Sequence, residues 1–142
     1  MDDEIQRIAS VLPPYARTMG MEVDRFDDGV PVLAYDFSHK IEGRPGYLHG
    51  GALGGLLEMA AHAALHAALD EKGVQVRFKP VNISIEYLRG GTEQRTFAMG
   101  RIIRSGRRVA NLRVEAWQDA RDKPVASAWM NFLLKPNDDR AA

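Results

Sequence analysis

The sequence predicts an α+β fold in which one long central helix is wrapped by a curled antiparallel sheet of about six strands, with a short N-terminal helix. Three observations support this prediction. Residues 49–69 form the one long stretch in which apolar residues recur every three or four positions, as on a buried helix. The segments around it alternate apolar and polar residues, as strands do. Turn-forming residues join several of these segments at the spacing of hairpins.

The N-terminal residues predict an outer helical arm. Asp2 or Asp3 can cap a helix with apolar residues on one side, and Pro13-Pro14 would end it. We therefore expect residues 1–14 to form an arm that packs outside the sheet. Residues 136–142 are expected to form a polar tail, and residues 1–142 a single domain.

Two strands and a loop are expected before the central helix. Residues 19–26 and 30–37 have the composition of strands, and the turn between them contains Asp27, Asp28 and Gly29, which favours a hairpin. Residues 38–48 are rich in glycine and charge, so we expect an irregular loop that leads to His49.

The central helix, predicted over residues 49–69, contains an unusual charge. Its leucines and alanines cover a broad surface that requires burial on several sides. Glu58 lies within this apolar stretch, and a buried carboxylate is costly unless it is paired, solvated or used in function. We therefore take Glu58 as the first candidate functional residue.

Four strand-like segments follow the helix: residues 74–88, 93–104, 107–117 and 124–134. In the first of them, Pro80 indicates an edge strand or a bulge, because proline cannot donate a hydrogen bond to a neighbouring strand. Ser105-Gly106 should form a tight turn between the second and third segments.

The composition excludes several classes of function. The 19 basic and 19 acidic residues give zero formal net charge, so no overall field would attract nucleic acid or an anionic membrane. The absence of cysteine excludes disulfides, thiolate catalysis and zinc-thiolate sites. The polar start MDDEIQR does not resemble a signal peptide, and the apolar helix, interrupted by Glu58, His62 and His66, is expected to be too short for a membrane span. We expect a cytoplasmic protein with no membrane or nucleic-acid partner.

Three segments together resemble a known family. His49-Gly50-Gly51, with Glu58 nine residues after the histidine, resembles the signature of hotdog-fold acyl-CoA thioesterases of the phenylacetate-pathway type. VNISIEYLR at residues 81–89 and RSGRRVA at residues 104–110 are similar to that family's next strand and hairpin. The resemblance covers roughly residues 36–136. It implies a hotdog fold, hydrolysis of an acyl-CoA to the free acid and CoA, and a homodimer, often a homotetramer, with the substrate at the subunit interface.

The chemistry of such a site can be stated from the residues. Free amides at a helix N-terminus can stabilise the negative charge that develops on a thioester carbonyl under attack. The resemblance assigns the polarising amide to Gly50 and the catalytic carboxylate to Glu58, acting either as nucleophile through a mixed anhydride or as general base on water. His49 would orient the thioester or the loop, and Gly51 would let the backbone approach the substrate.

The coenzyme phosphates require cations. Arg101, Arg104, Arg107 and Arg108 are concentrated around one predicted turn, and guanidinium groups match phosphate geometry. The resemblance also places Tyr87, Leu88 and Arg89 near the coenzyme channel. We expect no cofactor, because the CoA thioester would be the substrate, and no metal, because no third ligand motif accompanies His62 and His66.

Other interpretations stay open at this stage. Members of the family commonly carry Asn or Gln six residues before the position of His49, where this chain has Gly43, and often Ser or Thr where it has Pro80. The chain could therefore be a non-catalytic acyl-CoA binding protein, or, less in keeping with its residues, a hydratase or dehydratase. Glu58 could be a structural carboxylate, and the glycines of the helix could serve only close packing. His62 and His66 have a spacing compatible with metal ligation, although buried or interface histidines are commoner.

Overall fold

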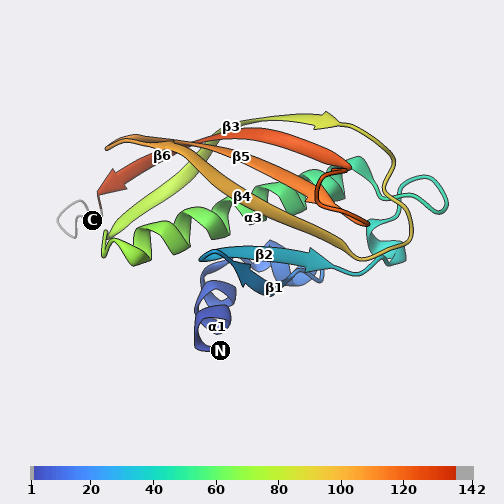
Figure 1. The fold of residues 1–142 in the computed structure, drawn as a ribbon, viewed down its shortest axis with the longest axis horizontal. Coiled ribbons are helices and arrows are strands. Elements are labelled where there is room, and N and C mark those ends of the chain that lie inside the picture. Colours follow the sequence, from blue (N-terminus) through green and yellow to red (C-terminus); the bar gives the residue numbers. More distant parts are fainter. Residues whose placement is uncertain (1, 137–142) are drawn as a thin grey trace.

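The computed structural model describes residues 2–136 and confirms the predicted fold class (Figure 1). Its helices are α1 (Asp2–Val11), α2 (Pro14–Thr18), the one-turn helix η1 (His39–Ile41) and α3 (Gly50–Glu71). Its strands are β1 (Glu22–Asp27), β2 (Val30–Tyr35), β3 (Val76–Tyr87), β4 (Thr96–Ser105), β5 (Val109–Trp117) and β6 (Ala126–Pro136).

The six strands form one antiparallel sheet in the order β1-β2-β4-β5-β6-β3, which curls around α3 (Figure 1). The inward-facing side chains of β5, predicted from the alternation, are all fully buried: Ala110, Leu112, Val114 and Ala116. The predicted turn at Ser105-Gly106 is confirmed, because Ser105 pairs with Ala110 and the Gly106 amide donates to the Val109 carbonyl over 2.9 Å.

The helix α3 is the centre of the core. Leu56, Leu57 and Leu65 are fully buried, and burying each side chain contributes about 1.5–3 kcal/mol. Helix and sheet approach closely at Gly100 on β4, where an added Cβ would lie 3.1 Å from the Ala61 Cα and 3.2 Å from the Ala64 Cβ. The position of α3 over β4 therefore depends on small residues on both elements.

The strand β3 forms one edge of the sheet. It pairs with β6, and the register shifts between Pro80 and Asn82, which confirms the bulge predicted at Pro80. The other side of β3 has no strand partner within residues 2–136. Two apolar residues of this strand, Val81 and Tyr87, are largely exposed. An edge that carries exposed apolar residues is suited to pairing with another chain.

The N-terminal arm differs in detail from the prediction. The helix α1 begins at Asp2, so Asp2 and Asp3 lie in its first turn rather than at its cap. A second short helix, α2, follows directly from Pro14 and was not predicted. Of the polar tail predicted at residues 136–142, residues 137–142 lie outside the described residues.

The expectation that the apolar helix is too short for a membrane span was wrong. Within residues 2–136, α3 is the one helix long and apolar enough to cross a membrane, with 22 residues. Most of it is buried against the sheet, so it is the core helix of this fold.

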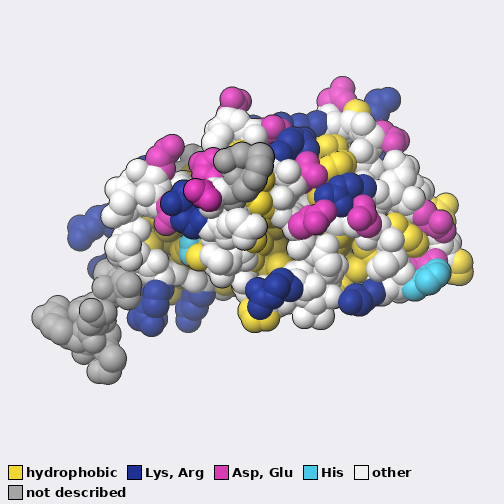
Figure 2. Space-filling model, turned by 90° about the horizontal axis from the view of Figure 1, so that it is seen from below, with side chains coloured by type: hydrophobic (Ala, Val, Ile, Leu, Met, Phe, Trp, Pro, Cys, Tyr) yellow, Lys and Arg dark blue, Asp and Glu magenta, His cyan; other side chains and the backbone are white. Residues whose placement is uncertain are grey.

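On the side of the molecule that carries α1, acidic and basic side chains lie interspersed (Figure 2).

Candidate active site

The start of α3 is capped by the side chain of His49. Its Nδ1 accepts hydrogen bonds from the backbone amides of Gly51 and Ala52, over 2.9 and 3.3 Å. An Nδ1 that accepts is unprotonated, so the ring is neutral and carries its proton on Nε2. A Cβ on Gly51 would lie 2.8 Å from His49 Cε1, so the glycine makes room for the capping ring.

The amide of Gly50 is left free by this cap. Gly50 is the first residue of α3, so its amide has no partner inside the helix. No other group among residues 2–136 accepts a hydrogen bond from it, while its carbonyl accepts one from the Tyr87 hydroxyl over 3.0 Å. The helix start therefore offers one unused donor, fixed by His49 and Tyr87.

The side chain of Glu58 borders an open groove between α3 and β3. The groove has a volume of about 490 Å³ and is lined by Pro13, Tyr15, Gly51, Gly54, Gly55, Glu58, Met59, Ile83, Ile85 and Tyr87. The carboxylate is partly exposed and makes no hydrogen bond or ion pair within the described part of the chain. A purely structural role for this carboxylate would require such a partner, and residues 2–136 provide none.

Glycines form the floor of the groove. Gly51 and Gly54 lie seven and four positions before Glu58, on the same face of α3. Gly54 also packs against β3, since an added Cβ would lie 2.9 Å from the Ile85 Cδ1. The glycines therefore serve close packing and leave a strip of bare backbone leading to Glu58.

The two ends of this strip are well separated along the helix. Gly50 and Glu58 are eight residues apart on a continuous helix. At 1.5 Å per residue, this spacing corresponds to about 12 Å along the helix axis.

The hairpin arginines lie at the opposite end of the sheet from Gly50. Val109 pairs with Leu133, which pairs with Lys79, whereas Tyr87 beside Gly50 pairs with Ala126. Eight residues of strand separate Lys79 from Tyr87, or about 26 Å. Figure 1 likewise places the β4–β5 turn at the end of the molecule where α3 ends. Within one chain, Arg104, Arg107 and Arg108 are therefore not beside Gly50, and all three are exposed.

Tyr87, Leu88 and Arg89 lie at the Gly50 end. Tyr87 lines the groove. Leu88 and Arg89 follow it, and their amides both donate to the Val125 carbonyl, over 2.9 and 3.2 Å. Arg101 pairs with Arg113 in the sheet and is exposed, away from these residues.

The packing around residue 43 explains why a glycine stands there. An added Cβ would lie 3.0 Å from the Cα of His49, and the Gly43 amide donates to the Tyr47 carbonyl over 2.8 Å. A larger side chain at this position would press on the backbone of the capping residue. This chain therefore provides no polar side chain at the position where the resemblance implies Asn or Gln.

His62 and His66 pack with aromatic rings under β3. Their rings are 5.0 Å apart, and the Phe78 ring lies 4.7 Å from each. Burial lowers the pKa of His62 to about 4 and lowers the pKa of His66 as well. No group of three or more side chains able to hold a metal ion is found in the described range.

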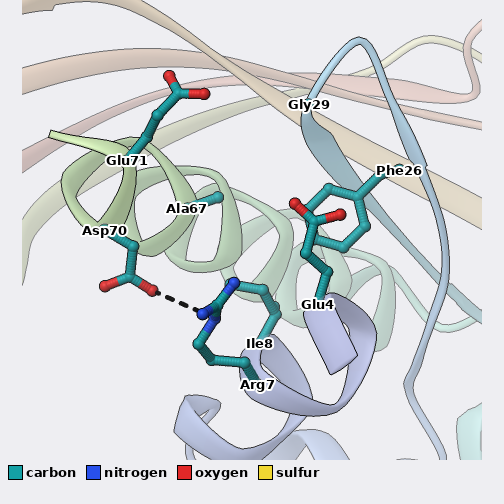
Figure 3. A pocket seen from close by; sticks show the side chains of 8 residues that line it. All are labelled: Glu4, Arg7, Ile8, Phe26, Gly29, Ala67, Asp70 and Glu71. Atoms are coloured by element: carbon teal, nitrogen blue, oxygen red, sulfur yellow. Dashed lines mark ion pairs between the residues drawn. The ribbon is translucent and has the colours of Figure 1, made fainter. Parts of the chain in front are cut away.

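A second hollow lies at the far end of α3, with a volume of about 260 Å³ (Figure 3). Arg7 on α1 and Asp70 on α3 form an ion pair across it, with 4.0 Å between Nε and Oδ2. Glu4 and Glu71 also line it. It contains none of the predicted site residues, and its mixed charges are largely solvated.

Tyr15 was not predicted from the sequence to lie in the groove. Tyr15 projects from α2 over Gly55, where an added Cβ would lie 2.2 Å from the Tyr15 hydroxyl. The exposed aromatic residue directly after Pro13-Pro14 was the available signal.

Known proteins resemble this chain in both sequence and structure. A model of the thioesterase superfamily matches residues 45–125. The medium/long-chain acyl-CoA thioesterase YigI of Escherichia coli K12 is 28% identical over 133 residues, covering 85% of each chain.

Solved structures give the same result for the fold. A Chromobacterium violaceum protein is 34% identical, with a TM-score of 0.72 over 96% of this chain and 93% of that one. A Haemophilus influenzae thioesterase, 16% identical, has a TM-score of 0.81 over 95% of this chain and 93% of that one. The predicted hotdog fold is confirmed. Because the family model matches more than half of its residues, the chain belongs to the thioesterase superfamily and is a thioester hydrolase.

Proposed function

We propose that this protein hydrolyses an acyl-CoA thioester to the free acid and CoA in the groove between α3 and β3. The observation that carries the proposal is the unpaired, partly exposed carboxylate of Glu58 above a glycine floor. The groove volume of about 490 Å³ is typical of small-molecule sites. The E. coli relative named an acyl-CoA thioesterase supports CoA as the leaving group.

The site is completed by a second copy of the chain. A polarising amide and an attacking group must both lie within about 3–3.5 Å of the thioester carbonyl. Gly50 and Glu58 of one chain are separated by about 12 Å along the helix axis, which favours taking the two groups from different protomers. We therefore pair Glu58 of one protomer with the Gly50 amide of the other.

The free edge of β3 provides the contact for a homodimer. Antiparallel pairing of two β3 strands would join the sheets and place the Lys79 end of one strand toward the Tyr87 end of the other. The same pairing brings the arginine-bearing hairpin of one protomer toward the helix start of its partner. This explains how Arg104, Arg107 and Arg108 could contact CoA phosphates. A homotetramer would consist of two such dimers.

Hydrolysis can follow either of two routes. If Glu58 is the nucleophile, its oxygen bonds to the carbonyl carbon, the C–S bond breaks, and water then hydrolyses the mixed anhydride. If Glu58 is the base, it takes a proton from water as the water oxygen attacks, and the C–S bond breaks. In both routes the CoA thiolate leaves and takes up a proton, and the Gly50 amide stabilises the oxyanion.

The lining of the groove indicates an apolar acyl group. Met59, Ile83 and Ile85 supply its apolar walls. Burial of each additional methylene would contribute about 0.8 kcal/mol, which favours longer acyl chains. An acyl-CoA substrate and the lack of cysteine both fit a cytoplasmic protein. The phenylacetate-pathway subtype stays a prediction.

The decisive experiment is thiol release from a panel of aryl- and fatty-acyl-CoA thioesters. We expect turnover by the wild-type protein and a loss of about 10²-fold or more in Glu58→Gln, which keeps the size of the side chain. Glu71→Gln, on the same helix but at its far end, is the matched control and should retain full activity. Equal rates for wild type and Glu58→Gln would refute the role of Glu58. Binding of acyl-CoA without turnover would refute hydrolysis and leave a binding protein.

A further inference from the structure

Tyr15 occupies a hollow that a glycine creates on the central helix. The hydroxyl of Tyr15 lies 2.2 Å, and its Cε2 and Cζ 2.9 Å, from where a Cβ of Gly55 would stand. Any side chain at residue 55 would displace the tyrosine. The ring is therefore seated directly on the backbone of α3, although it comes from the N-terminal arm.

This position places the hydroxyl over Gly55, one turn of α3 before Glu58. Gly55 precedes Glu58 by three residues, and side chains at this spacing are neighbours on a helix, with Cβ atoms about 5–6 Å apart. Tyr15 and Glu58 line the same groove. Tyr15 also lines an adjoining hollow of about 320 Å³ with Lys40, Glu42 and His49, so it stands where the two spaces meet.

The Tyr15 hydroxyl is available for a ligand. It makes no hydrogen bond within residues 2–136, and the side chain is 41% exposed. Of the polar side chains in the groove, Tyr87 donates to Gly50 and Glu58 is the proposed catalytic carboxylate. A ring needed only for packing would not require a hydroxyl at this place.

We propose that Tyr15 is a catalytic residue whose hydroxyl holds the water molecule consumed in thioester hydrolysis. The inference rests on the proposed function and deepens it. Both routes require a water beside Glu58, either to attack the thioester or to hydrolyse the anhydride. A tyrosine hydroxyl can both accept from and donate to that water. It supplies the polar contact that Gly43, packed against His49, has no side chain to provide.

The primary test is Tyr15→Phe, which keeps the ring and removes only the hydroxyl. We expect kcat to fall about tenfold or more, the equivalent of one lost hydrogen bond in the transition state, with KM changed less than about twofold. The melting temperature should stay unchanged, which excludes a folding defect. Tyr47→Phe is the matched control, because Tyr47 is 39% exposed and lies on the loop before His49.

A second variant tests the placement of the hydroxyl. Gly55→Ala puts a methyl group 2.2 Å from the present position of the Tyr15 hydroxyl and leaves the Glu58 side chain itself unchanged, so kcat should fall as in Tyr15→Phe. The double variant should lose little more than either single variant, because both remove the same contact. A purely structural Tyr15 would give Tyr15→Phe with wild-type kcat.

The outcomes separate the two proposals. Wild-type turnover with an unchanged kcat in Tyr15→Phe, or fully additive losses in the double variant, would overturn the role of Tyr15 alone. Absence of turnover by the wild-type protein across the whole panel would overturn the proposed function itself.

Discussion

The Nδ1 atom of His49 lies 2.9 Å from the backbone nitrogen of Gly51 and accepts its hydrogen bond. This contact gives the histidine a structural task, since the imidazole takes the place that Ser, Thr, Asp or Asn usually occupies at a helix start. It also determines which amides remain for a substrate. Gly51 and Ala52 are already engaged, and Gly50 is not.

The first prediction concerns this cap. His49→Ala should lower the free energy of unfolding by about 0.5–2 kcal/mol, because the amides of Gly51 and Ala52 lose their acceptor. His49→Asn should recover most of the loss, since asparagine is a good capping residue. Urea denaturation of the three proteins measures both effects. Equal stability of wild type and His49→Ala would show that the cap contributes nothing.

The second prediction concerns the free edge of β3. Val81 is 61% exposed on this strand, and a lysine there would place charge into a dimer contact. Val81→Lys should shift the protein from dimer toward monomer and lower thioesterase activity in parallel. Native mass spectrometry and light scattering report the change. Ile103→Lys, on β4 and 47% exposed, is the control that should remain dimeric. A monomeric wild type at working concentration would contradict the shared site.

The third prediction concerns the hairpin arginines. The double substitution Arg107→Ala with Arg108→Ala should raise KM for acyl-CoA about tenfold, because charge-assisted contacts to phosphate are lost. Thioesters of N-acetylcysteamine lack the phosphates, so their KM should not change. Steady-state kinetics with the two substrates separates these effects. An equal rise in both KM values would indicate a general disturbance of the site.

The fourth prediction concerns pH. Burial lowers the pKa of His62 to about 4 from its usual 6.5, and it faces His66, Phe78 and Phe132. Between these values the unfolded chain binds the proton more readily, so stability is complete above about pH 6.5 and falls as the pH drops toward 4. The expected loss between pH 7.5 and pH 5 is about 2 kcal/mol.

Denaturation at the two pH values tests this expectation. His62→Leu should reduce the difference between them, leaving a remainder from His66, whose pKa is also lowered. If the wild type and His62→Leu lose the same stability, burial of His62 does not cause the dependence on pH.

Features with a local cause were predictable from the sequence. The strands follow from alternation along single segments, and the bulge at Pro80 follows from its missing amide proton. The turn at Ser105-Gly106 is equally local. Each of these features can be inferred without knowing where any other segment lies.

Features that depend on distant contacts were not predictable. The seat of Tyr15 on Gly55 joins residues 40 positions apart in the sequence, and no periodicity reports it. The sequence also gave no sign that the hairpin arginines lie at the opposite end of the sheet from Gly50, because that separation results from strand register. The capping contact of His49 is local, but histidine is not one of the usual capping residues, so the residue type did not predict it.

The close approach of Gly100 to Ala61 and Ala64 bears on how this enzyme could be adapted to bulkier substrates. Since α3 already lies close against β4 at this point, the helix has no free space on that side into which it could move to widen the groove between α3 and β3. Enlargement must come from the opposite wall, by trimming Ile83 or Ile85, or from the arm that bears Tyr15. Redesign of acyl selectivity should begin with those three side chains.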